Sequence, residues 1–422
     1  MKQKAWGLAG LAAALTLAGC GSATDGGSGS GGESDTLVVW DWKAGDDSAA
    51  AYVAQAKADF AEQHPDVTVE FVAQPFEQYY TLLGAAIQAG EGPDVIMFNG
   101  GGQLRDRTNA LVPLDDYVAE DRQRLAGWEA FANDGEVYAS PVTLQGHPIY
   151  YNKALYEQAG LDPEQPATTW REFLDDCATI EDATGASCFA LGNKEGFGIQ
   201  FFMSGMGPSI LTPDEYDAWI DGQRDWESPN VRRLFELWTE AEEGGLNNPG
   251  VNSTAMFNDM FATFQAGEAA HVIGLMSDIG HWKDFNEFLG EDMVGVMAPP
   301  VVTEGATPLL PYDGGIGYGV ADWTPDPALA ADLVRSLTST EALNAFYVEA
   351  GAVASDTTID TSDGGPAVGW IVDQLGTGKP ALHVALSSAT QELMGRLSQQ
   401  LLSGSVSVDD ALAQLAEADE AG

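Results

Sequence analysis

The sequence of 422 residues is poor in basic side chains. It has 18 Lys and Arg against 64 Asp and Glu, which gives a formal net charge of −46. A surface this acidic repels phosphates and offers no basic patch, so we expect no nucleic-acid partner. We interpret the acidity as a solvated surface, although it would also suit a cationic ligand or a salty habitat.

Histidine and cysteine are scarce as well, with five and three residues. The sequence contains no Gly-x-Ser-x-Gly element, no His-Glu-x-x-His helix and no phosphate-binding loop, so common hydrolase, metalloprotease and nucleotide signatures are missing. A metal site would need several Cys or His ligands close together, and we expect neither a metal nor a cofactor. Glycoside hydrolysis needs a pair of carboxylates, but 64 acidic residues always provide some pair, so acidity does not argue for an enzyme.

A short apolar run stands near the N-terminus, where Lys2 and Lys4 precede Leu8 to Leu17 and the small residues before Cys20. The run is too short for a membrane span, and residues 1–20 predict an export signal. A cysteine at the cleavage point resembles the bacterial lipoprotein box. This implies that Cys20 carries a lipid and anchors the exported protein to the outer face of the cell membrane. Residues 21–35, rich in Gly and Ser, predict a flexible tether.

The remaining cysteines, Cys177 and Cys188, would close a short loop after a predicted helix. Export places them where disulfides persist. We therefore expect a structural disulfide rather than a metal site, which would need further ligands nearby.

The first part of the mature chain alternates strands and helices. Strand patterns at 36–40, 67–72 and 93–98 are separated by helix patterns at 49–63 and 79–89. This order predicts a parallel sheet covered by helices. Ligands of such sheets bind beyond the carboxyl ends of the strands, where Trp42, Lys43 and Asn99 stand.

Later elements follow the same logic. Strands are predicted at 188–191 and 270–274. Helices are predicted at 170–182, 231–243, 255–266, 327–336 and 341–348, and over 389–418 with a break near Gly404. The segment from Pro141 to Lys153 is apolar and aromatic, yet it is broken by Gly146 and by two polar side chains. We interpret it as a crossing between two lobes beside a cleft; the alternative is an ordinary buried strand with a bend.

A series of segments extends this reading over nearly the whole mature chain. They are Leu37 to Trp40; Phe60 to Pro65 with Val67 to Glu70; Gly92 to Val95; Leu111 to Tyr117; Tyr150 to Tyr156 with Ala159 to Leu161; Thr169 to Leu174; Phe264 to Ala270; and Tyr312 to Gly315. In this collinear order the chain resembles the extracellular solute-binding proteins of bacterial ABC importers. That family of sugar-binding lipoproteins includes the maltose-binding proteins.

The resemblance implies an α/β fold of the periplasmic-binding-protein type. Two α/β lobes with mainly parallel sheets would be joined by a hinge, with the ligand cleft between them. Lobe 1 would comprise residues 36–142 plus about 301–352, and lobe 2 would comprise residues 143–300 plus about 353–422. The return crossing would fall around Pro300 to Pro311 and the third crossing near Gly351 to Ser355.

The resemblance also implies a function. A monomeric, lipid-tethered protein would capture a small carbohydrate in the cleft, and its closure would signal to the permease subunits of an ABC transporter. No enzymatic activity is expected. The alternatives are a lipid-anchored glycoside hydrolase and a binding protein for a cationic or peptide-like solute.

Sugars present apolar ring faces edged by hydroxyl groups, so their sites need aromatic platforms and hydrogen-bonding side chains. We expect ligand contacts from residues at strand ends or at positions where the family binds its ligands. These are Trp42, Lys43, Asn99, Gly100, Gln145, His147, Glu195, Phe197, Met276, Asp278, Tyr312, Asp313 and Gly314.

Ordinary structural roles remain open for several of these residues. Lys43 could be a solvated turn residue, Gln145 a structural amide and His147 a satisfied loop histidine. Three departures from the family pattern bear on the ligand. Glycines replace charged residues after Asn99, Met276 stands where relatives place a tryptophan, and Gln391 and Glu392 replace C-terminal aromatic residues.

Overall fold

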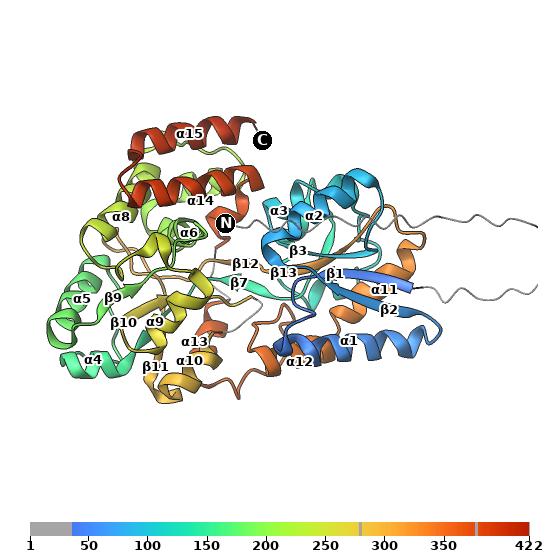
Figure 1. Cartoon of the computed structure of the whole chain (residues 1–422), viewed down its shortest axis with the longest axis horizontal. Coiled ribbons are helices and arrows are strands. Elements are labelled where there is room, and N and C mark those ends of the chain that lie inside the picture. The colour runs from blue at the N-terminus through green and yellow to red at the C-terminus, as the bar shows by residue number, and fades with distance from the viewer. Residues whose placement is uncertain (1–35, 278–280, 376–378, 422) are drawn as a thin grey trace, which may run out of the picture.

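The computed structural model describes residues 36–277, 281–375 and 379–421, which form two α/β lobes side by side (Figure 1). The export signal, Cys20, the tether and Asp278 therefore lie outside the described residues. The two lobes and the mixed α/β architecture confirm the predicted fold class. No helix in the described ranges is both long and apolar enough to cross a membrane.

Lobe 1 contains a five-stranded sheet in the order β2-β1-β3-β13-β6. Its strands are β1 (Thr36–Asp41), β2 (Thr68–Ala73), β3 (Val95–Asn99), β6 (Ala139–Pro141) and β13 (Ile316–Val320). β1 pairs with β2 and β3 in parallel, whereas β13 pairs with β3 and β6 in antiparallel fashion, so β13 alone is reversed. The lobe's helices are α1 (Ala50–Gln63), α2 (Phe76–Ala89), α3 (Gly102–Arg105), α11 (Pro327–Leu337) and α12 (Thr340–Ala350). The predicted strand-helix order of the first hundred residues is confirmed.

Lobe 2 contains a four-stranded sheet in the order β11-β8-β10-β9. Its strands are β8 (Ile149–Asn152), β9 (Ser187–Ala190), β10 (Ala269–Ile273) and β11 (Val294–Met297), and here β8 alone is reversed. The surrounding helices are α4 (Lys153–Ala159), α5 (Trp170–Thr184), α6 (Gly198–Ile210), α7 (Pro213–Ile220), α8 (Pro229–Glu243), α9 (Phe261–Gln265), α10 (Trp282–Leu289), α13 (Gly365–Gln374), α14 (Ser388–Leu402) and α15 (Val408–Ala421). The last two helices pack on α6 and α8.

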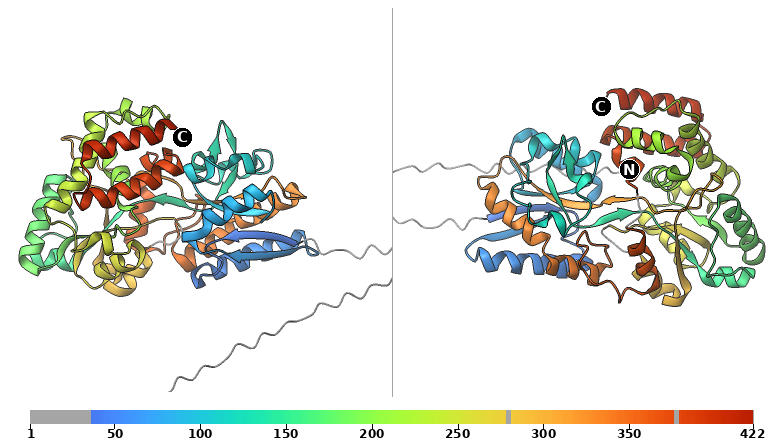
Figure 2. Two further views of the ribbon diagram at one scale, coloured as in Figure 1. Left: turned by 45° about the horizontal axis from the view of Figure 1, so that its top comes forward. Right: turned by 180° about the vertical axis from the view of Figure 1, so that it is seen from behind.

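The chain crosses between the lobes through a two-stranded ladder of β7 (Leu144–Gly146) and β12 (Tyr312–Gly314), which lies between the two sheets (Figures 1 and 2). β7 leads from β6 into β8, and β12 leads into β13. A third passage lies alongside, because Val353 accepts a hydrogen bond from Leu144 N–H at 2.9 Å. We call β7, β12 and residues 352–355 the hinge.

The return crossing comes later in the chain than the expected Pro300 to Pro311. Val301 bridges Thr169 of lobe 2, and Val302 N–H donates to Ser209 Oγ at 3.2 Å. Leu310 is buried in the core that holds Tyr150. Residues 301–310 therefore pack with lobe 2, and the chain returns to lobe 1 only at β12.

Candidate ligand-binding cleft

The side chain of Asp41 holds the turn after β1 in place through hydrogen bonds. This buried carboxylate accepts hydrogen bonds from the Tyr318 hydroxyl, from Lys43 N–H and, at 2.7 Å, from Ala44 N–H. Burial raises the pKa of Asp41, although these hydrogen bonds oppose the rise. The turn thus holds Trp42 and Lys43 at the carboxyl edge of the lobe 1 sheet, as predicted from their position after a strand.

Trp42 stands in an aromatic group at that edge. Its ring makes edge contacts with Tyr79 at 4.7 Å and Phe76 at 5.5 Å between centroids, and Tyr80 lies 6.3 Å away. Trp42 is partly buried and Phe76 is 38% exposed. Lys43 is mostly buried, with Nζ 3.5 Å from Asp46, and so is not the solvated residue that a turn would suggest.

The glycines of the loop after β3 pack closely against neighbouring backbone. Asn99 N–H donates to the Tyr80 hydroxyl at 2.9 Å, and Gly100 N–H donates to the Gly315 carbonyl at 2.9 Å. A Cβ on Gly100 would lie 2.6 Å from the Gly314 carbonyl oxygen. In this structure the Gly100 N–H is therefore already bonded and the space beside its Cα is filled by the protein, so its ligand contact stays a prediction without support from the geometry.

In the hinge, Gln145 remains a ligand candidate. Its Oε1 accepts from Ser277 N–H at 3.0 Å, while its Nε2 donates to no described residue. The side chain is partly buried. The Oε1 atom of Gln145 is therefore bonded within the protein, and its NH₂ group can donate to a ligand.

The neighbouring β12 residues serve the framework instead. The Tyr312 hydroxyl donates to the Leu375 carbonyl, and Asp313 accepts from Ala381 N–H at 2.7 Å. Burial raises the pKa of Asp313 to about 7. A Cβ on Gly314 would collide with the Gly127 backbone. The predictions of ligand contact for Tyr312, Asp313 and Gly314 are not supported, because each already holds the hinge together.

Two further predicted contacts lie in the core. His147 is 2% exposed and stacks on Phe201 with centroids 3.9 Å apart. Burial lowers its pKa well below the usual value, and its ring nitrogens have no partner among the described residues. Met276 is fully buried, with Sδ beside Gly146. Neither side chain is open to a ligand in this structure, so the geometry gives no support to these two predictions. Asp278 lies outside the described residues.

A cavity of about 290 Å³ lies between the lobes, and Glu195 and Phe197 line it as two of the predicted residues. Lobe 1 contributes Gln103 from α3. Lobe 2 contributes the rest of the lining: Gln200, Gln391, Glu392, Gly395, Arg396 and Gln399. We call this space the interlobe cavity. Amides, carboxylates, a guanidinium and one aromatic ring surround it, which is the side-chain chemistry that hydroxyl groups and sugar rings need.

Close backbone packing positions Glu195 and Phe197. Gly196 has φ of 81°, and a Cβ there would lie 2.5 Å from the Gly395 carbonyl oxygen on α14. Glu195 Oε2 accepts from Met256 N–H at 3.0 Å. The loop between β9 and α6 is thereby pressed against α14, with Glu195 exposed and Phe197 partly exposed.

Most of the other lining residues are not predicted from the sequence. A usable signal exists on α14, where Glu392, Arg396 and Gln399 recur at helical spacing and so share one face. Gln391 and Glu392 stand out in the sequence only because they replace aromatic residues of the family. Gln103 and Gln200 carry no signal, because a lone glutamine on a helix is commonplace.

The lobes also touch at a second place, beside the cavity. The Arg105 guanidinium donates to the Val384 carbonyl at 2.5 Å, and Asp106 accepts from Ser388 N–H at 2.9 Å and from the Ser388 hydroxyl. Gly102 packs directly on the Leu386 backbone. We call the contacts of Arg105 and Asp106 with Val384 and Ser388 the latch.

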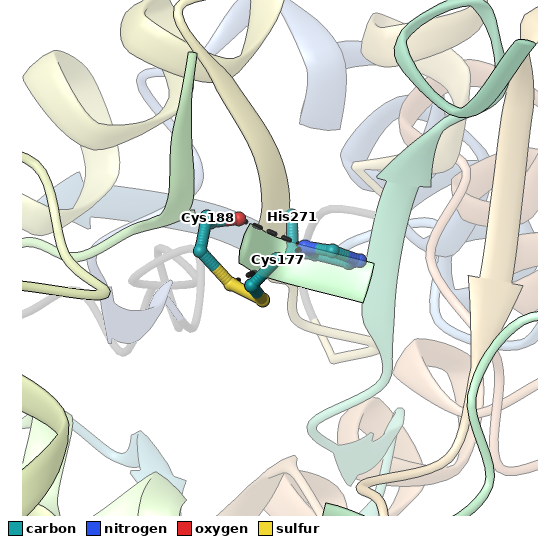
Figure 3. A group of neighbouring side chains, drawn as sticks. All are labelled: Cys177, Cys188 and His271. Carbon is teal, nitrogen blue, oxygen red and sulfur yellow. Dashed lines mark hydrogen bonds between the residues drawn. A yellow bond between two sulfur atoms is a disulfide. The ribbon is translucent and has the colours of Figure 1, made fainter. Parts of the chain in front are cut away.

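Cys177 on α5 and Cys188 on β9 form a disulfide, with Cα atoms 4.9 Å apart (Figure 3). His271 on β10 lies beside it, with Nδ1 2.8 Å from the Cys188 carbonyl and Nε2 2.8 Å from the Tyr156 hydroxyl. Burial lowers the pKa of His271 to about 4, so the ring is neutral; Nδ1–H donates and Nε2 accepts. With both sulfur atoms bonded to each other, this group is a structural staple in the core of lobe 2.

A smaller space of about 70 Å³ lies inside lobe 2, between the sheet and helices α5, α6 and α8. Its lining is almost wholly apolar and includes Trp170, Phe202 and Trp238. Hydroxyl groups would find few partners there, so this space does not suit a sugar.

Residues 43–343 match the model of the family described as bacterial extracellular solute-binding protein. The chain belongs to this family. Among curated relatives, the sn-glycerol-3-phosphate-binding periplasmic protein of Yersinia enterocolitica is 24% identical over 247 residues, 55% of each chain. The alignments span no more than 62% of the length of the first curated relatives.

Solved structures extend the likeness over almost the whole fold. A chitin oligosaccharide binding protein superposes with a TM-score of 0.79 at 19% identity, covering 92% of this chain and 100% of that chain. Maltose-bound MalE3 of T. maritima has a TM-score of 0.74 at 20% identity, covering 91% and 99%. At these identities the likeness establishes the two-lobed fold.

Proposed function

We propose that this chain is the substrate-binding component of an ABC importer and holds a carbohydrate between its lobes. The observation that carries the proposal is the interlobe cavity, because side chains of both lobes line it and Gln200, Glu195 and Phe197 offer hydroxyl partners and a ring platform. Structural neighbours named for chitin oligosaccharide and maltose support the choice of ligand class.

The proposed mechanism is closure. The lobes are joined by three short passages that can absorb a rotation, and a ligand completes its contacts only when the cleft shuts. Each hydrogen bond adds a net of about 1 kcal/mol, so affinity comes from several acting together with ring stacking. The closed form would then dock on the permease. A lipid on Cys20 would keep the monomer near that permease.

A glycoside hydrolase is the alternative that the cavity brings back, because Glu195 and Glu392 both line it. A hydrolase needs one carboxyl held neutral in an apolar pocket, whereas both of these side chains are exposed. We therefore propose binding without turnover. Release of product from aryl-glycosides would overturn this part of the proposal.

Calorimetry with neutral sugars, amines and peptides tests the ligand class, and thermal shift offers a rapid first screen because binding raises the melting temperature. We expect saturable binding of a carbohydrate. Binding of peptides alone would contradict the proposal.

Trp42→Ala tests whether the aromatic edge of lobe 1 takes part. Loss of this ring is expected to weaken sugar binding at least tenfold, about 1.4 kcal/mol, if the ligand extends from the interlobe cavity, which Trp42 does not line, to the carboxyl edge of the lobe 1 sheet. Unchanged affinity in a folded variant would remove Trp42 from the site. Circular dichroism controls for folding, since Trp42 also packs on Tyr79.

A further inference from the structure

The lining of the interlobe cavity consists mainly of hydrogen-bond acceptors. Gln200 Nε2 donates to the Gln391 carbonyl at 3.0 Å, and Gln391 Nε2 donates to the carbonyls of His383 and Leu386, both at 3.1 Å. A carbonyl oxygen only accepts, so the NH₂ group of each amide must face the protein. The Oε1 atoms of Gln200 and Gln391 are left without a donor among the described residues.

Gln399 follows the same pattern and Gln103 is the exception. Gln399 Nε2 donates to the carbonyls of Asn193 at 3.2 Å and Lys194 at 2.6 Å, which leaves its Oε1 to the cavity. Gln103 Oε1 instead accepts from the Arg107 guanidinium at 3.1 Å, so Gln103 offers its NH₂ group. Three of the four lining amides therefore present an acceptor.

Gln200 presents such an acceptor at the cavity surface. The residue as a whole is only 4% exposed, yet it lines the cavity, and its Oε1 receives no hydrogen bond from the described part of the chain. A donor from a bound molecule can therefore bond to this oxygen.

The charges of the lining also favour a donor-rich ligand. Glu195 and Glu392 stand against Arg396, an excess of one negative charge. The charges of Glu392 and Arg396 cancel in this count, which leaves the negative charge of Glu195. One Glu195 oxygen is used by Met256 N–H, and the other is open. Lys194 is exposed and outside the lining.

We propose that the carbohydrate carries a protonated amine, that is, an amino sugar with a free amino group. This inference rests on the proposed function and names the substrate class of the same cavity. An ammonium group has three donors and no acceptor, so it matches amide oxygens and a carboxylate. Phosphorylated and carboxylated sugars add acceptors and negative charge where the lining already has both. The net charge of −46 also attracts a cation from a distance.

Chito-oligosaccharides provide a matched pair of probes, since the same chain can carry free or N-acetylated amines. Calorimetry on the wild-type protein, at a pH where the free amine is protonated, should give a Kd at least about tenfold lower for the free-amine form. The preference should shrink with added salt and as the pH rises above the pKa of the amine. Equal or tighter binding of the N-acetylated form overturns the inference and leaves the proposed function intact. Binding of no carbohydrate at all overturns both.

Glu195→Gln locates the effect, and Glu157→Gln on α4 is its control. Both remove one negative charge from an exposed glutamate, but Glu157 lies outside the cavity. Glu195→Gln should weaken binding of the free-amine form about tenfold more than it weakens binding of the N-acetylated form, because only the free amine loses a charged partner. An equal loss in Glu157→Gln would show that only the overall charge matters and would contradict the proposal.

Discussion

The two places where the lobes meet, the hinge and the latch, are built differently. The hinge is a backbone ladder between β7 and β12, supported by the third passage and largely buried. The latch consists of side chains of lobe 1 that bond to Val384 and Ser388 of lobe 2, and its Asp106 contact is exposed. Opening the cleft can break the latch at low cost, whereas the hinge has to survive it. We therefore expect the lobes to rotate about the hinge and to separate at the latch, which mutations at the two places can test.

The largest effect should come from crowding the hinge. In Gly314→Val, the new side chain collides with the Gly127 backbone and approaches Phe131, so we expect a loss of about 3 kcal/mol of unfolding free energy. Gly84→Ala is the control: nothing lies within 4 Å of its new Cβ, and the exchange in α2 should stabilise by up to about 1 kcal/mol. Denaturant unfolding measures both. Equal stability of the two variants would mean that the hinge is not tightly packed.

The hinge should also be sensitive to pH. Burial raises the pKa of Asp313 to about 7 from an unfolded value of about 3.9. The folded state therefore holds a proton that the unfolded state has lost, and stability falls as the pH rises from about 4 to 7. Between pH 5 and 7 this amounts to at most about 2.7 kcal/mol.

Asp313→Asn is the corresponding variant. Its side-chain oxygen can still accept from Ala381 N–H, but it does not titrate in this range. Thermal unfolding across pH 5 to 8 should show a flatter pH dependence for the variant than for the wild type. Parallel curves would show that Asp313 is not the titrating group.

The smallest effect should come from the latch. Asp106→Ala removes the acceptor of the Ser388 contacts, which favours the open form. Ligand-free protein should then have a larger radius of gyration by small-angle scattering. Ligand affinity should fall a few-fold because fewer molecules are ready to bind. Asp66→Ala, at an exposed turn of lobe 1, is the control for the lost charge. A variant that is no more open than this control would contradict the role of the latch.

Local patterns in the sequence predicted much of the fold. The spacing of apolar residues predicts the alternation of strands and helices in lobe 1. The predicted break near Gly404 separates α14 from α15. Helix α6 was missed because Gly205, Gly207 and Pro208 weaken its pattern. Tertiary contacts explain two of these residues, since Gly205 packs on Pro299 and Gly207 packs on Leu382. No local pattern contains such contacts.

The site was harder to predict for the same reason. Glu195 and Phe197 belong to a short motif and line the interlobe cavity, whereas His147 and Met276 stand at matching positions but are buried in the core. Gln103 and Gln399 are 296 positions apart and meet only because the lobes face each other. The orientation of each glutamine amide depends on the backbone carbonyls that accept from its NH₂ group. These carbonyls come close to the amides only in the folded structure.

The most direct test of the whole account is a calorimetric titration of the wild-type protein with a panel of oligosaccharides. We expect saturable heat at one carbohydrate per chain, with the sugar recovered chemically unchanged. The absence of heat with every sugar, or recovery of cleaved sugar, would contradict a protein that grips a carbohydrate between its lobes without altering it.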